Sequence, residues 1–189
     1  PLEQFATWFV DAEKTPTVEE PNAMTLSTVD TQGVPKARVV LLKECTQEGF
    51  VFYTNYTSGK AQAIAQNNKV CISFFWPSLE RQIIITGLAV KISEEKSIAY
   101  FNKRPRESQL GALVSDQSTS IDSRVALEEK LLDLERQFQT KPIVKPAHWG
   151  GYLIQPTSYE FWQGRSSRLH DRIKYTKINN SWNIGRLQP

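Results

Sequence analysis

Two stretches of the sequence combine cationic side chains with an apolar or aromatic setting. The first runs from Arg38 to Lys43 and reads RVVLLK; the second reads FWQG from Phe161 and continues as RLHDR from Arg168. Guanidinium and ammonium groups bind phosphate, whereas apolar and aromatic surface receives planar rings. The two stretches therefore predict a site for an aromatic ligand that carries phosphate.

The stretch from Arg38 to Lys43 reads as a strand. Side chains alternate along a strand, so Arg38 and Leu42 would lie on one face and Val39 and Lys43 on the other. The two cations would lie at opposite ends and on opposite faces, where they could serve two different anions. Two strand-end charges that reach solvent are the alternative.

Ser58-Gly59-Lys60 opens a predicted helix just after Tyr53 and Thr54 end a strand. Free backbone N–H groups and the helix dipole favour an anion at such a position, and Lys60 adds a positive charge. An ordinary helix cap beside a surface lysine is the alternative interpretation.

Tyr100, Arg104 and Ser108 recur at intervals of four residues. A phenol, a guanidinium and a hydroxyl can together hold a phosphate. Pro105 breaks the helix between them, so they need not form one helical face, and a charged loop is the alternative.

Arg168, His170 and Arg172 would project to one side of an extended segment. A planar guanidinium can lie over an aromatic ring, and an imidazole can hydrogen-bond a ring substituent. A polar turn is the alternative.

Most catalytic motifs are absent from the sequence. His148 and His170 are the only histidines, and no cluster has the spacing of zinc ligands. The sequence contains no GxSxG elbow, no Walker loop and no GxGxxG between a strand and a helix. A hydrolase or a metalloenzyme is poorly supported, and a bound cofactor would have to supply the difficult step of any reaction.

Composition sets the class of protein. The 189 residues are 40% hydrophobic and 23% charged, which fits one globular domain. The net charge of +3 is dispersed along the chain, unlike the concentrated basic face of a nucleic-acid binder. Cys45 and Cys71 lack CxxC spacing, which favours a reduced cytoplasmic location. The apolar runs are too short to span a bilayer, so we expect neither a nucleic-acid nor a membrane partner.

The elements that would position these residues are mostly short strands. We expect a helix at 2–12, a connector that contains Pro16 and Pro21, shorter helices at 61–66 and 93–102, and a long helix at 123–139. Leu127, Leu131, Leu134 and Phe138 share one face of the long helix, as expected for core or subunit packing. We expect strands from residue 23 and at 37–42, 50–54, 70–75, 82–92, 150–155, 158–163, 172–178 and 181–186. This pattern predicts a single domain over residues 1–189, built as an antiparallel barrel or sandwich with flanking helices.

Several motifs occur in the order found in pyridoxamine (pyridoxine) 5′-phosphate oxidases, and the chain resembles that family from about residue 21 to Pro189. The motifs are RVVLLK, FYTN, SGK, ERQ, YFNKRPRESQLGA, SDQS, WGGY, FWQG and RLHDR. The resemblance implies an FMN-binding split barrel, which is a Greek-key antiparallel β-barrel with flanking helices. It also implies a homodimer that binds FMN in the cleft between subunits.

The resemblance also assigns residues to each ligand. The implied FMN contacts are Arg38, Val39, Val40, Leu41, Leu42, Lys43, Tyr53, Thr54, Lys60, Gln82, Gln117, Ser118, Trp162 and Arg172. The substrate phosphate would meet Lys43, Tyr100, Arg104 and Ser108, and Arg168 and His170 would face the substrate pyridine ring as catalytic residues.

The implied reaction belongs to vitamin B6 biosynthesis and salvage. A hydride leaves the exocyclic carbon of pyridoxamine or pyridoxine 5′-phosphate for flavin N5. The alcohol becomes pyridoxal 5′-phosphate directly, and the amine does so through an imine that water hydrolyses. O2 then reoxidises the flavin and gives H2O2, so that the protein supplies mainly positioning and charge.

The chain departs from the family pattern at two places. Gly59 stands where many members have Arg, so we expect one FMN phosphate contact fewer and a lower affinity for FMN. Members commonly carry an N-terminal arm with Arg and Tyr over the substrate, whereas this sequence begins at Pro1. The expectation is weaker substrate capture or a shortened chain.

Three other functions are compatible with such a barrel. A binding module would hold FMN or pyridoxal 5′-phosphate without turnover, but it would not need Arg168, His170, Tyr100, Arg104 and Ser108. A reductase would combine a nicotinamide donor with a deazaflavin or haem. A structural dimer is the third.

Overall fold

The computed structural model describes residues 1–189, from Pro1 to Pro189. The strands are β1 (Ala23–Val29), β2 (Pro35–Leu41), β3 (Glu44–Thr46), β4 (Gly49–Asn55), β5 (Lys69–Trp76), β6 (Arg81–Lys91), β7 (Trp149–Gln163), β8 (Asp171–Ile178) and β9 (Ser181–Leu187). The helices are α1 (Leu2–Lys14), α2 (Gly59–Gln66), α3 (Glu94–Lys103), α4 (Arg106–Val114) and α5 (Arg124–Phe138), with 3-10 turns η1 (Pro77–Leu79) and η2 (Ser166–Arg168).

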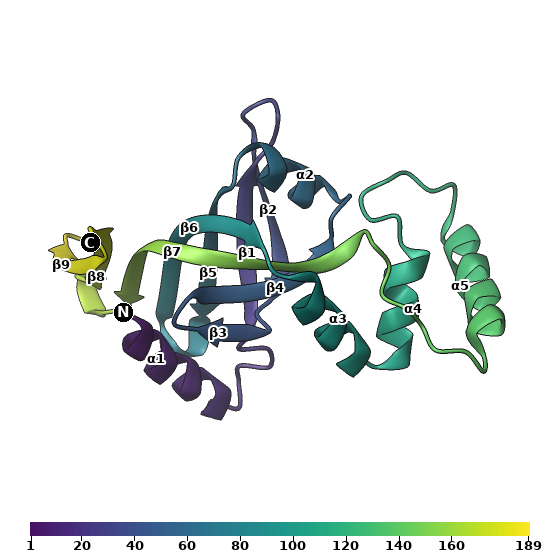
Figure 1. Ribbon diagram of the computed structural model, residues 1–189. Helices are drawn as coiled ribbons and strands as arrows, with labels where there is room; N and C mark the ends of the chain where they lie inside the picture. The colour runs from purple at the N-terminus through teal and green to yellow at the C-terminus, as the bar shows by residue number, and fades with distance from the viewer.

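The strands form one antiparallel nine-stranded sheet. Their order is β2-β1-β5-β6-β7-β4-β3, and β8 extends the sheet from β7 and pairs with β9. The backbone N–H of Lys43 donates to the carbonyl of Val51 at 2.9 Å, which links the end of β2 to β4 and curls the sheet into a split barrel. In Figure 1 the β8–β9 hairpin lies at one end of the molecule and α3, α4 and α5 lie at the other.

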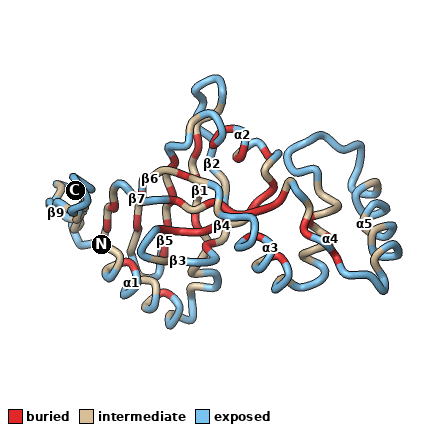
Figure 2. The backbone as a smooth tube through the Cα atoms, viewed as in Figure 1, coloured by how far each residue is buried: buried red, intermediate tan, exposed pale blue.

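Alternating apolar residues fill the barrel. Met24 and Leu26 on β1 point inward and are almost fully buried, as are Ile72 and Phe74 on β5. The buried residues follow the central strands, whereas α5 and the β8–β9 hairpin are mainly exposed (Figure 2). Period-two burial of this kind is what a sheet with one covered face requires.

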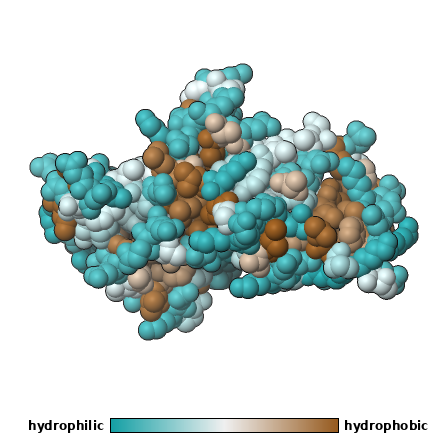
Figure 3. Space-filling model, in the orientation of Figure 1, coloured by the Kyte–Doolittle hydropathy of each residue, from teal (hydrophilic) through white to brown (hydrophobic).

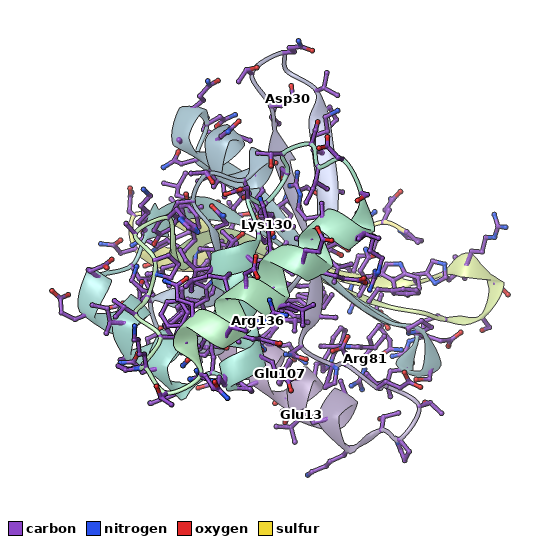
Figure 4. All side chains as sticks on the ribbon, turned by 90° about the vertical axis from the view of Figure 1, so that its right-hand side faces the viewer. Glu13, Asp30, Arg81, Glu107, Lys130 and Arg136 are labelled. Atoms are coloured by element: carbon purple, nitrogen blue, oxygen red, sulfur yellow. The ribbon has the colours of Figure 1, made fainter.

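Helix α1 covers one opening of the barrel. Its Phe5 is buried against Phe50 and Phe74, with ring centroids 4.8 Å and 5.3 Å away. Arg81 at the start of β6 pairs with Asp11 at 2.7 Å and lies beside α1 in Figure 4. The helix is therefore held by both core packing and an ion pair.

Helices α3, α4 and α5 enclose a second, smaller core with the start of β7. Phe101, Leu110 and Trp149 are buried in it, and Leu131, Leu134 and Phe138 of α5 pack against it. Figure 3 shows apolar surface beside α4 and α5. Three of the four residues on the predicted α5 stripe therefore face this core, while Leu127 is exposed.

The predicted architecture, a mainly antiparallel split β-barrel with flanking helices, is confirmed. The prediction of two separate strands at 150–155 and 158–163 is wrong, because the single strand β7 runs unbroken through both ranges. Pro156 lies opposite Gly87 at a shift in the β6–β7 register, where the N–H that proline lacks is not needed by the ladder. None of the helices combines the length and the apolar character that a membrane-spanning segment needs.

The sequence interpretation also missed α4 and the short strand β3. Pro105 reads as the end of a helix, and α3 does end just before it. The same proline then stands at the N-cap of α4, where a proline is tolerated because the first N–H groups of a helix have no intrahelical partner.

Candidate active site

A cavity of about 640 Å³ opens between β2, β4, the start of β7 and helices α3 and α4; we call it the main cavity. Its lining comprises Val39, Val40, Leu41, Lys43, Tyr53, Thr54, Asn55, Lys60, Tyr100, Lys103, Arg104, Pro105, Ser108, Gly111, Ala112, Ser115, Gln117 and Trp149. The lining contains four cationic side chains and no carboxylate. Such a cavity selects an anionic ligand that also presents apolar surface.

Lys60 lies on the first turn of α2 and reaches back to the end of β4. Its Nζ donates to Gln117 Oε1 at 2.7 Å, to Thr54 Oγ1 at 3.1 Å and to Ser58 Oγ at 3.3 Å. All three acceptors are neutral, so the charge of Lys60 remains uncompensated.

A second cavity of about 690 Å³ adjoins the first, and the two share Val39, Lys60 and Gln117; we call it the adjoining cavity. Arg38 and Ser118 also line it. The Nη1 atom of Arg38 donates to Thr28 Oγ1 at 2.8 Å, and no carboxylate pairs with this guanidinium. Two cations therefore converge where the two cavities meet.

Burial and mutual repulsion affect the titration of these cations. Desolvation, followed by repulsion from Arg38, lowers the pKa of Lys60 to about 8. Desolvation also lowers the pKa of Arg38 below its usual range. A bound dianion would relieve both effects, so the site is electrostatically prepared for phosphate.

Three parallel aromatic rings form the other wall of the main cavity. Tyr53 stacks on Tyr100 with centroids 3.9 Å apart and on Trp149 with centroids 5.3 Å apart. Arg104 lies over the ring of Trp149 at 4.7 Å. Its Nη1 atom is buried and has no hydrogen-bond partner, which is rare for a buried charged group. Arg104 lines the cavity and forms no ion pair with a carboxylate, so its charge is available to an anion.

Five further residues named from the sequence lie elsewhere in the chain. Gln82, Trp162 and Arg172 are neighbours across β6, β7 and β8, and Arg168 and His170 lie in the connection between β7 and β8. We call these five residues the β7–β8 cluster. None of them lines the main or the adjoining cavity.

The β7–β8 cluster is organised by its own contacts. Arg172 is paired with Glu160 at 2.7 Å, and the ring of Trp162 lies 4.7 Å from that of His170. Arg168 has a φ of 60°, in the left-handed region, and belongs to an exposed turn. Arg168 is exposed on this turn, whereas His170 is half-buried and accepts a hydrogen bond from the Arg165 N–H at 3.1 Å.

The structure thus separates the residues named from the sequence into two groups. The two cavities collect Arg38, Val39, Val40, Leu41, Lys43, Tyr53, Thr54, Lys60, Tyr100, Arg104, Ser108, Gln117 and Ser118. The side chain of Leu42 instead packs in the barrel core. The β7–β8 cluster forms the second group, on the side of the sheet that ends at the C-terminal hairpin.

The structure adds Lys103, Asn55 and Trp149 to the cavity lining, and the sequence interpretation assigned no role to them. Trp149 begins the WGGY motif, and this motif was the feature of the sequence that could have pointed to a role for Trp149. A Cβ at Gly150 would lie 2.3 Å from the Tyr56 hydroxyl, so glycine at this position permits Tyr56 to pack against the start of β7. No group of three or more His, Cys, Asp or Glu side chains is arranged to hold a metal ion.

Comparisons with known proteins match nearly the whole chain to one family. Residues 10–137 match the family described as pyridoxamine 5′-phosphate oxidase, and residues 149–189 match the pyridoxine 5′-phosphate oxidase C-terminal dimerisation region. A pyridoxine/pyridoxamine 5′-phosphate oxidase from Christiangramia forsetii is 55% identical over 98% of this chain and 86% of its own. The protein of that name from Flavobacterium psychrophilum is 54% identical over 100% and 89%.

Solved structures are similar over the whole chain. PhzG from Burkholderia lata, crystallised with tetrahydrophenazine-1-carboxylic acid, has a TM-score of 0.94 and 28% identity, covering 100% of this chain and 92% of its own. A pyridoxamine 5′-phosphate oxidase-related, FMN binding protein from Nostoc punctiforme has a TM-score of 0.79 at 17% identity, covering 100% and 97%, and its likeness concerns the fold alone.

Proposed function

The chain belongs to the pyridoxamine 5′-phosphate oxidase family, and from this premise we propose how its residues bind FMN and oxidise the substrate. It is an oxidoreductase that acts on pyridoxamine 5′-phosphate and pyridoxine 5′-phosphate. The observation that carries the proposal is the main cavity, where four cations and an aromatic wall meet without any carboxylate. A phosphorylated ring is the ligand that uses both features.

The junction of the two cavities fits the phosphate of FMN. Arg38 and Lys60 would hold it there, with Gln117 and Ser118 as further hydrogen-bonding partners. The apolar residues Val39 and Leu41 offer surface to the ring system. When bound, FMN supplies the hydride acceptor and passes the electrons to O2, with H2O2 as the product.

The α3 side of the main cavity fits the substrate phosphate. Lys43, Tyr100, Arg104 and Ser108 line it, and no carboxylate of the chain neutralises Arg104. Lys103 adds a further cation. Two phosphate sites at separate ends of the connected cavities would hold cofactor and substrate in one orientation relative to each other, which is the main contribution the protein can make.

The β7–β8 cluster would complete the site from a second copy of the chain. Four of its five residues lie in the part of the chain that matches a dimerisation region, and none of the five lines a cavity of its own chain. In a symmetric dimer each cluster would enter the cavity of the other subunit. Arg168 and His170 would then face the substrate ring, and Gln82, Trp162 and Arg172 would contact FMN.

We also propose that residues 1–189 act as one domain, because β7 pairs with barrel strands on both sides and with β8 as well. A cytoplasmic location stays a prediction from the two free cysteines.

Anaerobic addition of pyridoxamine 5′-phosphate to the FMN-loaded protein tests the proposal. Oxidation of the substrate should bleach the yellow flavin band, and admission of oxygen should restore it with formation of H2O2. A protein that binds FMN and pyridoxal 5′-phosphate but leaves the band unchanged would be a binding module instead. A deazaflavin or haem spectrum in the purified protein would identify a reductase.

A further inference from the structure

The buried lysine Lys145 does not line the main cavity, but it contacts Trp149, which does. Its side chain is 2% exposed, and lysine is almost never buried to this degree unless it is paired. The ammonium group donates to the carbonyl of Trp149 at 2.7 Å and to that of Pro146 at 3.0 Å. It also forms an ion pair with Glu94 at 3.0 Å.

These three contacts join two elements that carry cavity residues. Glu94 is the first residue of α3, and Trp149 is the first residue of β7. Figure 1 shows α3 beside this end of β7. The Lys145 ammonium therefore fixes the start of one element against the start of the other.

Two weaker links continue the attachment along α3. The Gly151 backbone N–H donates to Ser97 Oγ at 3.4 Å, and the ring of Phe101 packs edge-on against Trp149 with centroids 5.2 Å apart. Arg104 follows directly as the C-cap of α3 and lies over the same tryptophan ring. Displacement of α3 relative to β7 would change the position of the guanidinium against its aromatic support.

The charge of Lys145 is not needed to fill space. A hydrophobic side chain of similar length could occupy the same space, but it would leave the carbonyls of Trp149 and Pro146 and the carboxylate of Glu94 without their shared donor. The ammonium adds directional hydrogen bonds, which hold two carbonyls and one carboxylate at fixed positions relative to each other.

We propose that Lys145 is a positioning residue for the substrate phosphate: it orders Trp149 and α3 so that Arg104 is held in its binding position. This inference rests on the proposed function, since it assigns the Arg104 end of the cavity to the substrate phosphate.

The test compares Lys145→Met with Lys141→Met, an exposed lysine in the same connection between α5 and β7 that forms no ion pair. Equilibrium binding of pyridoxal 5′-phosphate and steady-state kinetics with pyridoxamine 5′-phosphate are measured on the holoenzyme. Lys145→Met should raise both the dissociation constant and KM by about 10-fold, with kcat within about twofold of the wild type. Lys141→Met should change none of them.

A double-mutant cycle with Arg104→Met separates positioning from general stability. If Lys145 acts through Arg104, adding Lys145→Met to Arg104→Met should cause little further loss of affinity. Equal losses in both backgrounds would overturn the inference, as would an unchanged KM in the single variant. Failure of the wild-type holoenzyme to oxidise the substrate would instead overturn the proposed function.

Glu94→Gln keeps the test decisive if Lys145→Met does not fold. Glu94 is 59% exposed, so its replacement leaves the buried core intact. It should raise KM in the same direction by a smaller factor, about threefold, and the increase should again vanish in the Arg104→Met background. A Glu94→Gln enzyme with the KM of the wild type would contradict the proposed role.

Discussion

Lys60 donates a hydrogen bond of 2.7 Å to the side-chain carbonyl of Gln117, although 57 residues separate the two in the chain. The contact connects the first turn of α2 to the loop between α4 and α5, across the junction of the two cavities. A neutral acceptor leaves the charge of Lys60 available, and Arg38 lines the adjoining cavity that shares Lys60 and Gln117 with the main cavity. The account of FMN binding depends on this pair of uncompensated cations.

Lys60→Met should weaken FMN binding by roughly 10- to 100-fold, because a charge-assisted hydrogen bond contributes about 1.5–3 kcal/mol. Titration of the protein with FMN, followed by flavin fluorescence, gives the dissociation constant. Lys14→Met is the matched control, since Lys14 lies at the exposed end of α1. Equal affinity of the Lys60 variant and the wild type would remove Lys60 from the phosphate site.

FMN affinity should depend on pH through the same side chain. The pKa of Lys60 in the unliganded protein is lowered to about 8, so Lys60 is protonated below that pH and loses its proton above it. Binding of a dianion favours the charged form and raises this pKa, so the dissociation constant should begin to rise as the pH approaches 8 and should rise more steeply above it. Lys60→Arg, which stays protonated, should flatten the rise; a rise of the same steepness in that variant would assign the titration to another group.

Gly59→Arg should strengthen FMN binding by about 3- to 10-fold by adding a cation to the adjoining cavity. Gly59 lines that cavity, and a Cβ there would meet only Ser118, at 3.9 Å. The backbone of Gly59 does not require a positive φ, so the larger side chain fits without strain. Gly59→Ala is the control and should leave the affinity unchanged; unchanged affinity in the arginine variant as well would show that the new guanidinium does not reach the phosphate.

Arg168→Leu should lower turnover by about 100-fold or more while FMN stays bound. Without Arg168 the substrate ring would be misplaced relative to the flavin, and positioning of the two rings is the main contribution of the protein to the rate. Arg168 has no hydrogen bond or ion pair within its own chain, so the replacement breaks no internal contact. Turnover and the FMN dissociation constant are measured on the same preparation. An Arg168→Leu enzyme with the wild-type kcat would exclude a role at the substrate ring.

Local patterns in the sequence predict most of the elements. Ser93 caps α3 with a side-chain bond to the N–H of Lys96, as its position before two glutamates indicates. Asp30 lies at the tip of the β1–β2 hairpin (Figure 4). Its carboxylate accepts from the N–H groups of Gln32 and Val34, which closes the turn. Both contacts lie within a few residues, so a short window of sequence contains all the information they need.

The site itself depends on contacts that no local pattern contains. Periodicity places Arg38 on a strand and Lys60 on a helix, but it cannot show that the two side chains share a cavity. Trp149 carries the aromatic wall only because α3 packs against the start of β7, far from it in the sequence. The resemblance to a family assigns all the cofactor and substrate residues to one site. The structure shows that within one chain they form two separate groups, one in the cavities and one in the β7–β8 cluster.

Mixed dimers test most directly whether two subunits complete one site. Arg104→Met damages the cavity, and Arg168→Leu damages the β7–β8 cluster, so at a substrate concentration well below the wild-type KM each homodimer should be nearly inactive. Random mixing of the two chains should restore roughly one quarter of the wild-type turnover, because half of the dimers would then contain one site with both parts intact. A mixture that forms hybrid dimers but stays as inactive as the separate variants would contradict the account, since each site would then lie within a single chain.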